Sequence, residues 1–475
     1  MTPAASITFH DWISKWLNFN FVNTIDALSR HAWSIYGKTQ RTRSENVELW
    51  FTAKCASALV SSMHLNSNRL LTLENEDFRS LKVLWPTVDI YEDLPEDEWS
   101  PVRRLLRQNF DSFSFQDDSY RESVSRYFAL YENYFDSTDV NWSLVLGLEA
   151  TDYFHVWLCL ISIARQSGGL ISLPLNAGDS DVRDHLARYQ LTQEKFRMFI
   201  EALELDVNNL TDELNSEAVF RFSELSKLLE RPIVRKQIDQ YVVPVPEYFH
   251  SAASDLIYYK GYAQYQERFS NQLGLAFERF IYDQILSFAD QVGVEIYRIP
   301  ADSTLERKRC DFALKIDTTL ILIEAKISRL KSQTKFGLGN VRSDILKVLE
   351  EPIDQIVQTH EDILNGSLTL PFTHESNKIF SLLVLLEPFH SANSSEVRTI
   401  TGPFPENFKV ISAKEFEDLI SHCDRHLSLN AIKRSHSLQF KTKSLWEAMC
   451  SFRGYKWVIS PIVRAALDLA PWASF

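Results

Sequence analysis

Three charged side chains, Asp311, Glu324 and Lys326, are of the types needed to hydrolyse a phosphodiester bond. Glu324 and Lys326 end one apolar run, and Asp311 begins another. Carboxylate oxygens are preferred ligands of Mg²⁺, which usually keeps waters and binds substrate phosphate as well. A lysine beside such an ion can orient the attacking water or stabilise the charge that develops on the phosphate. These residues predict a hard-cation site, provided that the fold brings them together.

The apolar runs predict an antiparallel hairpin made of strands 311–316 and 320–327. A turn centred on the two threonines of the connecting sequence DTT would place Asp311 opposite Lys326. Because side chains alternate between the two faces of a strand, Asp311, Glu324 and Lys326 would then share one face. A three-residue loop would shift the register by one and turn Asp311 to the wrong face.

A third carboxylate, Glu278, lies in a segment whose apolar pattern predicts a helix. We expect this helix to begin at Ser270 or Asn271 and to end at Gly293. Glu278 is flanked by apolar residues on its face of the helix, which is unusual for a solvated carboxylate. This position favours a location near the predicted cation site.

A structural interpretation of the same residues stays open. The three charged residues of the hairpin would then form a salt-bridge cluster at a sheet edge. Glu278 would be a boundary residue paired with Arg279 or Lys308.

The surrounding elements are expected to form a sheet flanked by helices. Strand character is found in segments 294–299, 311–316, 320–327 and 380–388, with 408–413 as a further candidate. A helical segment is expected from about Asn340, interrupted at Pro352 and ended at Asn365-Gly366. The expected order is therefore helix, three strands, helix, strand.

In this order and in its charged residues, the chain resembles the PD-(D/E)xK nuclease superfamily, which has the restriction-endonuclease-like fold. The resemblance rests on Glu278 in the first helix, Asp311 at a strand start, and Glu324-Ala325-Lys326 in the next strand. It covers about residues 271–415, under a third of the chain. Cys310 stands where the name-giving proline would be, a position at which the superfamily often lacks proline.

The resemblance implies a metal-dependent phosphodiesterase. Asp311, Glu324 and the carbonyl group of Ala325 would bind Mg²⁺ or Mn²⁺. Lys326 would be the catalytic lysine, and Glu278 an additional acid near the metal.

In part of the superfamily the second helix also contributes a glutamine near the site. Gln355 is the candidate here and Gln358 a poorer one, with a surface glutamine as an equal alternative.

Basic residues gather on both sides of the predicted site. In an acidic protein such a concentration suggests a surface that contacts the phosphates of nucleic acid. The predicted contact residues are Arg307, Lys308, Arg309, Arg329, Lys331, Lys335 and Arg342.

The composition limits the function in several ways. The chain has 475 residues and a formal net charge of −13, so it does not coat nucleic acid non-specifically. Its five cysteines form no CxxC pair, which disfavours a zinc ribbon or a disulfide framework. No glycine-rich phosphate loop is present, which excludes a P-loop motor. The N-terminus lacks signal-peptide features, and the longest apolar run, 154–164, indicates a core helix, so a cytoplasmic protein without a membrane segment is expected.

The predicted architecture is multidomain. It has a mostly helical N-terminal domain (1–240), a linker (241–270), an α/β restriction-endonuclease-like core (271–415) with a mixed four- to five-stranded sheet flanked by helices, and a helical C-terminal extension (416–475).

The expected function is metal-dependent cleavage of nucleic acid, with DNA favoured by analogy with the superfamily. A bacterial restriction or anti-phage defence effector is the expected role, with a protein activator or a homodimer as expected partners. The alternatives are an RNase, and a non-catalytic protein that binds nucleic acid or a partner through a helical scaffold.

Overall fold

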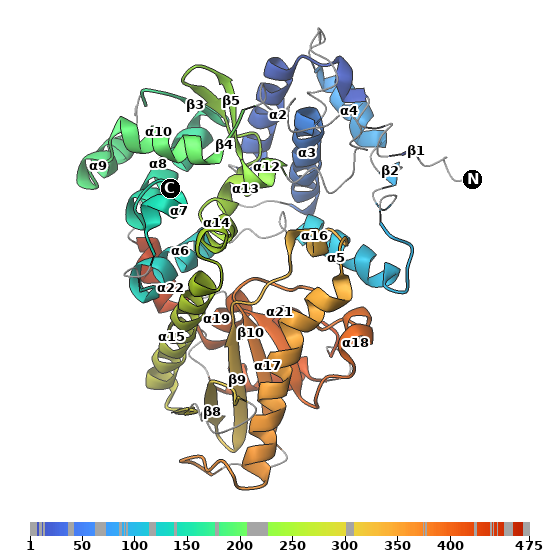
Figure 1. Ribbon diagram of the computed structural model, residues 1–475, viewed down its shortest axis with the longest axis vertical. Helices are drawn as coiled ribbons and strands as arrows, with labels where there is room; N and C mark the ends of the chain where they lie inside the picture. The colour runs from blue at the N-terminus through green and yellow to red at the C-terminus, as the bar shows by residue number, and fades with distance from the viewer. Residues whose placement is uncertain are drawn as a thin grey trace.

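The computed structural model describes most of the chain. The described residues are 7–8, 12, 15–36, 42–61, 73–84, 88–89, 91, 94–113, 120–136, 140–175, 180–206, 227–300, 308–373, 375, 378–421, 425–437, 439, 441–443, 445–450 and 459–468. They form a mainly helical part and an α/β part built on a five-stranded sheet (Figure 1). The predicted combination of a helical region with an α/β region is therefore confirmed.

The helical part is built around α8 (Ala150–Ser167), in which Phe154, Trp157 and Leu160 are buried. Its other described helices are η1 (Lys15–Asn18), α2 (Phe21–Tyr36), α3 (Arg43–Ser61), α4 (Asn75–Leu84), α5 (Ser100–Phe113), α6 (Tyr120–Ala129), η4 (Leu130–Tyr134), α7 (Trp142–Leu146), α9 (Ser180–Arg188), α10 (Gln193–Leu203) and α12 (Lys227–Glu230). By length and hydropathy the helical stretch Trp142–Ser167 could cross a membrane. However, 72% of its most apolar 18-residue segment is buried inside the protein.

Short strands also occur in the helical part, which the sequence did not indicate. A four-stranded sheet has the order β3-β6-β5-β4. Its strands are β3 (Leu170–Ser172), β4 (Glu204–Leu205), β5 (Ile233–Gln237) and β6 (Gln240–Val242). A further pair joins β1 (Ile7–Thr8) to β2 (Val88–Asp89). Strands of two to five residues are too short to show a clear alternation of apolar and polar positions.

The α/β part contains the sheet predicted from the sequence. Its order is β11-β10-β9-β8-β7, with strands β7 (Glu295–Arg298), β8 (Phe312–Ile316), β9 (Thr319–Lys326), β10 (Ile379–Leu385) and β11 (Phe408–Ser412). The first three strands form an antiparallel meander, and β10 and β11 are added in parallel. The prediction of a mixed sheet is confirmed.

Two long helices flank the sheet, α15 (Glu267–Val292) and α17 (Val341–Leu364), as Figure 1 shows. Apolar residues of α15 share a core with Phe312 and Ile323, whereas those of α17 share another with Ala313 and Leu322. Helix α17 begins at its N-cap Asn340 as predicted, but it continues through Pro352, so the predicted interruption is wrong.

The predicted linker at 241–270 is also wrong. This segment contains the end of β6, α13 (Pro246–Ser251), α14 (Asp255–Tyr265) and the first turn of α15. Val243, Phe249 and Ile257 within it are fully buried. The segment contains Pro244 and Pro246, residues that are common in linkers, but Pro246 begins α13, where its fixed φ angle suits the first helical turn.

The remaining helices lie around the sheet and at the C-terminal end of the chain. They are α16 (Ser332–Lys335), α18 (Ser395–Thr401), α19 (Ala413–Ser421), α20 (Arg425–Ser435), α21 (Leu445–Cys450) and α22 (Pro461–Asp468). The two parts are joined through buried contacts: Arg126 of α6 forms an ion pair with Glu417 of α19, both side chains being at most 5% exposed.

Candidate functional site

The β8–β9 hairpin brings Asp311 and Glu324 opposite each other. Phe312 and Ile323 form the last pair of the ladder, so Asp311, which precedes Phe312 at a bend, lies beside Glu324. The predicted register, with Asp311 opposite Lys326, is wrong by two residues because the turn consists of Asp317 and Thr318, with Asp317 in the left-handed region. A shift of two residues preserves the face of every side chain. The predicted common face is therefore retained.

This common face is the one covered by α17. The neighbouring residues Ile323 and Ala325 belong to the core on the α15 side, and Leu322 belongs to the core on the α17 side. Because successive side chains alternate, Glu324 and Lys326 point to the α17 side.

Direct contacts connect the central charged residues. The Ala325 N–H donates to Asp311 Oδ2 at 2.8 Å. The Lys326 ammonium forms an ion pair with Glu324 Oε1. Glu324 is fully buried, and its carboxylate contacts both the Lys326 ammonium and the Asp311 carboxyl group. One buried carboxylate therefore has a single lysine as its compensating group.

Burial dominates the electrostatics of these carboxyl groups. It raises the pKa of Glu324 well above its ordinary value, and the negative charge of Asp311 adds to the effect. Burial also raises the pKa of Asp311, against the opposing effects of Lys326 and the Ala325 N–H. Burial alone would lower the pKa of Lys326, but Glu324 and Asp311 outweigh it, so this pKa is raised.

Glu278 belongs to the same electrostatic cluster although its helix, α15, covers the other face of the sheet. Burial raises the pKa of Glu278, and Asp311 adds to this, while Lys326 and Arg298 act in the opposite direction. The structure thus brings Glu278 within the electrostatic range of both Asp311 and Lys326.

Gln355 of α17 is buried and reaches the same region. Its Nε2 donates to Glu351 Oε1 at 3.2 Å, and its Oε1 has no hydrogen-bond partner among the described residues. One turn later, Thr359 Oγ1 accepts the Cys310 N–H at 2.8 Å and fixes the backbone next to Asp311. The alternative of a surface glutamine is therefore wrong.

Two residues near the site were not foreseen from the sequence. Glu351 contributes to raising the pKa of Lys326, and Arg298 opposes the rise at Glu278 and Asp311. The spacing of Glu351 and Gln355, one helical turn, could have indicated the first. Nothing in the sequence pattern singles out Arg298 from other strand-end arginines.

Three of the basic residues expected to contact nucleic acid are instead buried in ion pairs, so this part of the prediction is wrong. Arg309 Nε lies 2.6 Å from Asp362 Oδ2. The Arg329 side chain is only 4% exposed, and its guanidinium carbon lies 3.8 Å from the centroid of the Tyr258 ring. Lys335 is buried against Glu387.

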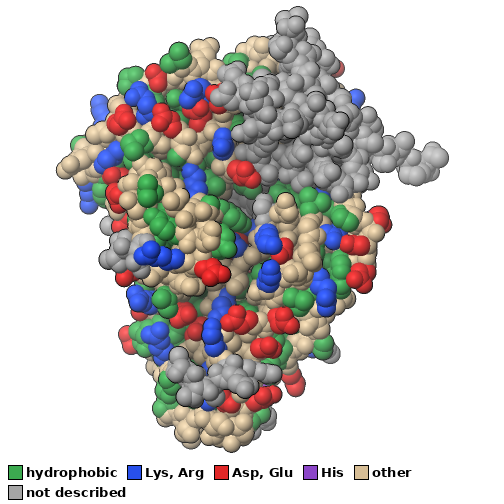
Figure 2. Space-filling model, viewed as in Figure 1, with side chains coloured by type: hydrophobic (Ala, Val, Ile, Leu, Met, Phe, Trp, Pro, Cys, Tyr) green, Lys and Arg blue, Asp and Glu red, His purple; other side chains and the backbone are tan. Residues whose placement is uncertain are grey.

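Three other predicted contact residues are exposed, namely Lys308, Lys331 and Arg342. The seventh, Arg307, lies outside the described residues. Figure 2 shows basic side chains interspersed with acidic ones on the displayed face, without a continuous basic area.

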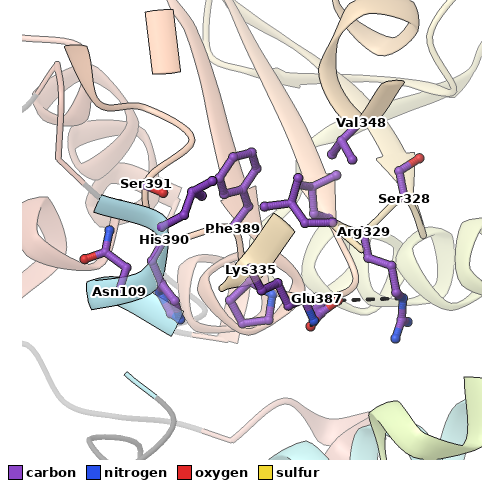
Figure 3. Close-up of a pocket in the computed structure, with 13 residues that line it drawn as sticks. Asn109, Ser328, Arg329, Lys335, Val348, Glu387, Phe389, His390 and Ser391 are labelled. Atoms are coloured by element: carbon purple, nitrogen blue, oxygen red, sulfur yellow. Dashed lines mark hydrogen bonds and ion pairs between the residues drawn. The ribbon is translucent and has the colours of Figure 1, made fainter. Parts of the chain in front are cut away.

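A small pocket lies beyond the C-terminal ends of β9 and β10 (Figure 3). Its wall includes Asn109 of α5 together with Arg329, Lys335 and Glu387, and its volume is about 40 Å³. This is room for a few water molecules rather than for a nucleotide. The charged cluster does not line it, so we base the chemistry on the cluster and not on the pocket.

The residues present suit a divalent cation. The carboxyl groups of Asp311 and Glu324 are adjacent, Glu324 is fully buried and Asp311 is partly buried, and burial raises the pKa of both above their ordinary values. Among the described residues, no group of three or more His, Cys, Asp or Glu side chains has a metal-binding arrangement. A hard cation bound by two carboxylates, backbone oxygen and water does not need such a group.

Comparisons of the chain with protein-family models, with curated proteins and with solved structures found no match.

Proposed function

We propose that the chain is a metal-dependent nuclease that hydrolyses phosphodiester bonds in nucleic acid. The observation that carries the proposal is the adjacency of Asp311, Glu324 and Lys326 on one face of a buried hairpin. The order of α15, β7, β8, β9, α17 and β10 supports it, since it is the order of the PD-(D/E)xK core that the sequence resembles.

In this proposal the chain supplies positioned groups. Asp311, Glu324 and the Ala325 carbonyl would hold Mg²⁺ or Mn²⁺, which would compensate charge on the phosphate and lower the pKa of a bound water. The Ala325 N–H fixes the Asp311 carboxylate through its hydrogen bond. Lys326 would orient the attacking water or stabilise the developing negative charge, which is the task of a preorganised cation.

Glu278 and Gln355 would assist from the two flanking helices. Gln355 has an unpaired buried amide oxygen, which can accept a hydrogen bond from water or from a group on the substrate.

DNA is the proposed substrate, by analogy with the superfamily. The exposed residues Lys308, Lys331 and Arg342 are the candidates for backbone contacts. A role in restriction or anti-phage defence within the cytoplasm, with a protein activator or a second copy of the chain, belongs to the same proposal.

The test is cleavage of plasmid DNA, single-stranded DNA and RNA by the full-length protein with Mg²⁺ or Mn²⁺. We expect Lys326→Ala and Asp311→Ala to reduce the rate by at least about a hundredfold, since each removes a group placed to act in the transition state. Lys315→Ala is the matched control. Lys315 also forms an ion pair on the hairpin, at 2.5 Å from Glu295, but lies outside the cluster.

Cleavage that persists in both site variants would refute the proposal. Preferential cleavage of RNA would correct the substrate. If wild type cuts nothing, calorimetry with Mn²⁺ decides: absence of binding indicates a non-catalytic protein that retains the fold.

A further inference from the structure

The site contains more acidic groups than basic groups in direct contact with them. Three carboxyl groups, those of Glu278, Asp311 and Glu324, influence one another, whereas a single lysine, Lys326, is in direct contact with one of them. Arg298 lowers the pKa of Glu278 and Asp311, whereas Lys326 is the cation that lowers the pKa of Glu324. The charge on Glu324 is therefore compensated by Lys326.

Lys326 also occupies one of the two carboxylate oxygens of Glu324, Oε1. Glu324 is fully buried, and the Lys326 ammonium is the positively charged group that touches its carboxylate. A divalent cation bound to Glu324 at about 2.0–2.2 Å would compete with the ammonium for the same carboxylate. Two neighbouring positive charges would in addition repel each other.

The two partners differ in their freedom to move. The Lys326 side chain is 24% exposed, whereas that of Glu324 is 0% exposed. Glu324 is also held in the middle of the sheet, because β9 pairs with β8 on one side and with β10 on the other. An exchange of cations at Glu324 would therefore move the lysine and not the carboxylate.

We propose that Lys326 is the resident counter-ion of Glu324 in the metal-free protein, and that binding of a divalent cation displaces its ammonium toward the substrate side of the site. This inference rests on the proposed function. It gives Lys326 two successive roles, since the ammonium that leaves Glu324 becomes available to the phosphate or to the attacking water. Before the metal binds, Lys326 is therefore paired with Glu324 and is not available to the substrate.

The test compares Mn²⁺ binding to the full-length wild type, Lys326→Met and Lys326→Arg by calorimetry at one fixed pH near neutrality, without nucleic acid. Met has a similar length without a charge, so it removes the competitor. We expect Lys326→Met to bind Mn²⁺ roughly fivefold more tightly, as expected for loss of a partly exposed ion pair. Lys326→Arg retains the positive charge and should bind no more tightly than wild type.

Thermal unfolding of the same proteins gives a second readout. Without metal, Lys326→Met should unfold at a lower temperature than wild type, because it leaves Glu324 uncompensated. Saturating Mn²⁺ should remove this difference. A lysine with only a structural role predicts a loss of stability that Mn²⁺ does not reverse. If Lys326→Met fails to fold, Lys326→Gln takes its place, and Lys315→Met is the control in both experiments.

The outcomes separate this inference from the proposed function. If wild type binds Mn²⁺ and Lys326→Met binds it equally or more weakly, the counter-ion role is refuted while the metal site stands. If neither protein binds Mn²⁺, the metal site fails, and both proposals fall with it.

Discussion

Glu278, Asp311 and Glu324 place three carboxyl groups near the ammonium of Lys326. Burial raises the pKa of each carboxyl group, which means that folding disfavours the ionised form of each. Such clusters are typical of functional sites, although structural ion-pair networks perturb pKa values as well. Variants that change one charge at a time distinguish a functional site from a structural ion-pair network.

The pH dependence of stability follows from the direction of these shifts. A carboxyl group with a raised folded-state pKa stabilises the protein fully below its unfolded-state pKa, and this contribution is lost as pH rises through the folded-state value. We therefore expect metal-free Glu278→Gln, which cannot ionise, to have a higher Tm than wild type near neutrality, by on the order of 2 °C. The difference should vanish at about pH 4.

Thermal unfolding across this pH range, in the presence of a chelator, measures the effect. Glu361→Gln, at an exposed position of α17, is the control. A stabilisation by Glu278→Gln that is independent of pH would show that the charge of Glu278 is not its cause.

The sequence predicted which residues come together better than how they contact each other. Glu324 and Lys326 share a face because side chains alternate along a strand, and Asp311 joins them because the observed register differs from the predicted one by two residues, an even number. Burial was not predictable in the same way. Arg329 and Lys335 are charged residues of loop-like sequence, yet both are buried and both form ion pairs with the buried Glu387, which is distant in sequence.

The loop between α16 and α17 is held by a helix from the other part of the protein. Arg107 of α5 donates to the Phe336 carbonyl at 2.8 Å, and Arg103 donates to the Gly337 carbonyl at 2.8 Å. This loop follows the strand that bears Lys326 and leads into the helix that bears Gln355. Helix α5 thus positions the connection between two elements of the candidate site.

Substitution of Gly337 tests the contact between α5 and the loop that follows α16. Its φ angle is +77°, and a Cβ atom there would lie 2.6 Å from the Arg103 carbonyl oxygen. Gly366 has φ +78° with open space around a Cβ, so Gly366→Ala measures the backbone strain alone, about 1–3 kcal/mol. We expect Gly337→Ala to reduce the free energy of unfolding by clearly more than Gly366→Ala, and to lower the cleavage rate. Urea unfolding compares them, and equal losses would mean that the loop moves away from α5 without cost.

The bounds of β9 and the end of α15 at Gly293 were predictable, but the predicted start of α15 at Ser270 or Asn271 is wrong, since the helix begins at Glu267. Bounds decided by a proline or by a short strand were not predictable either. Helix α17 continues through Pro352, and helix α13 starts at Pro246. Pro352 is buried inside α17 despite the tendency of proline to end a helix, whereas Pro246 stands at a helix start, where its fixed φ angle is favourable.

The helical part and the α/β part are connected at several places along the chain. The α6–α19 ion pair is buried, α5 contacts the loop after α16, and Ser460 near the C-terminal end donates to Gln284 of α15. Helix α15 packs against η4 and α14 as well as against the sheet. The core of the candidate nuclease is therefore shared with the rest of the protein.

A fragment of residues 271–415 should consequently fail to fold by itself. It would expose the apolar side of α15 that packs against η4 and α14, and it would lack Glu417 and the partner Arg126. We expect insoluble or non-cooperatively unfolding material, whereas the full chain should unfold in a single transition seen by both far-UV and near-UV circular dichroism. A fragment that unfolds cooperatively and cleaves nucleic acid would show that the two parts are independent.

The position of β9 inside the sheet has an evolutionary consequence. With strands paired on both edges, its backbone is fixed independently of the side chains at positions 324 and 326. A single substitution at either position could therefore remove the chemistry and leave the architecture in place. Proteins that descend from such a variant would keep the fold after the loss of nucleic-acid cleavage. Selection could then retain them for binding alone.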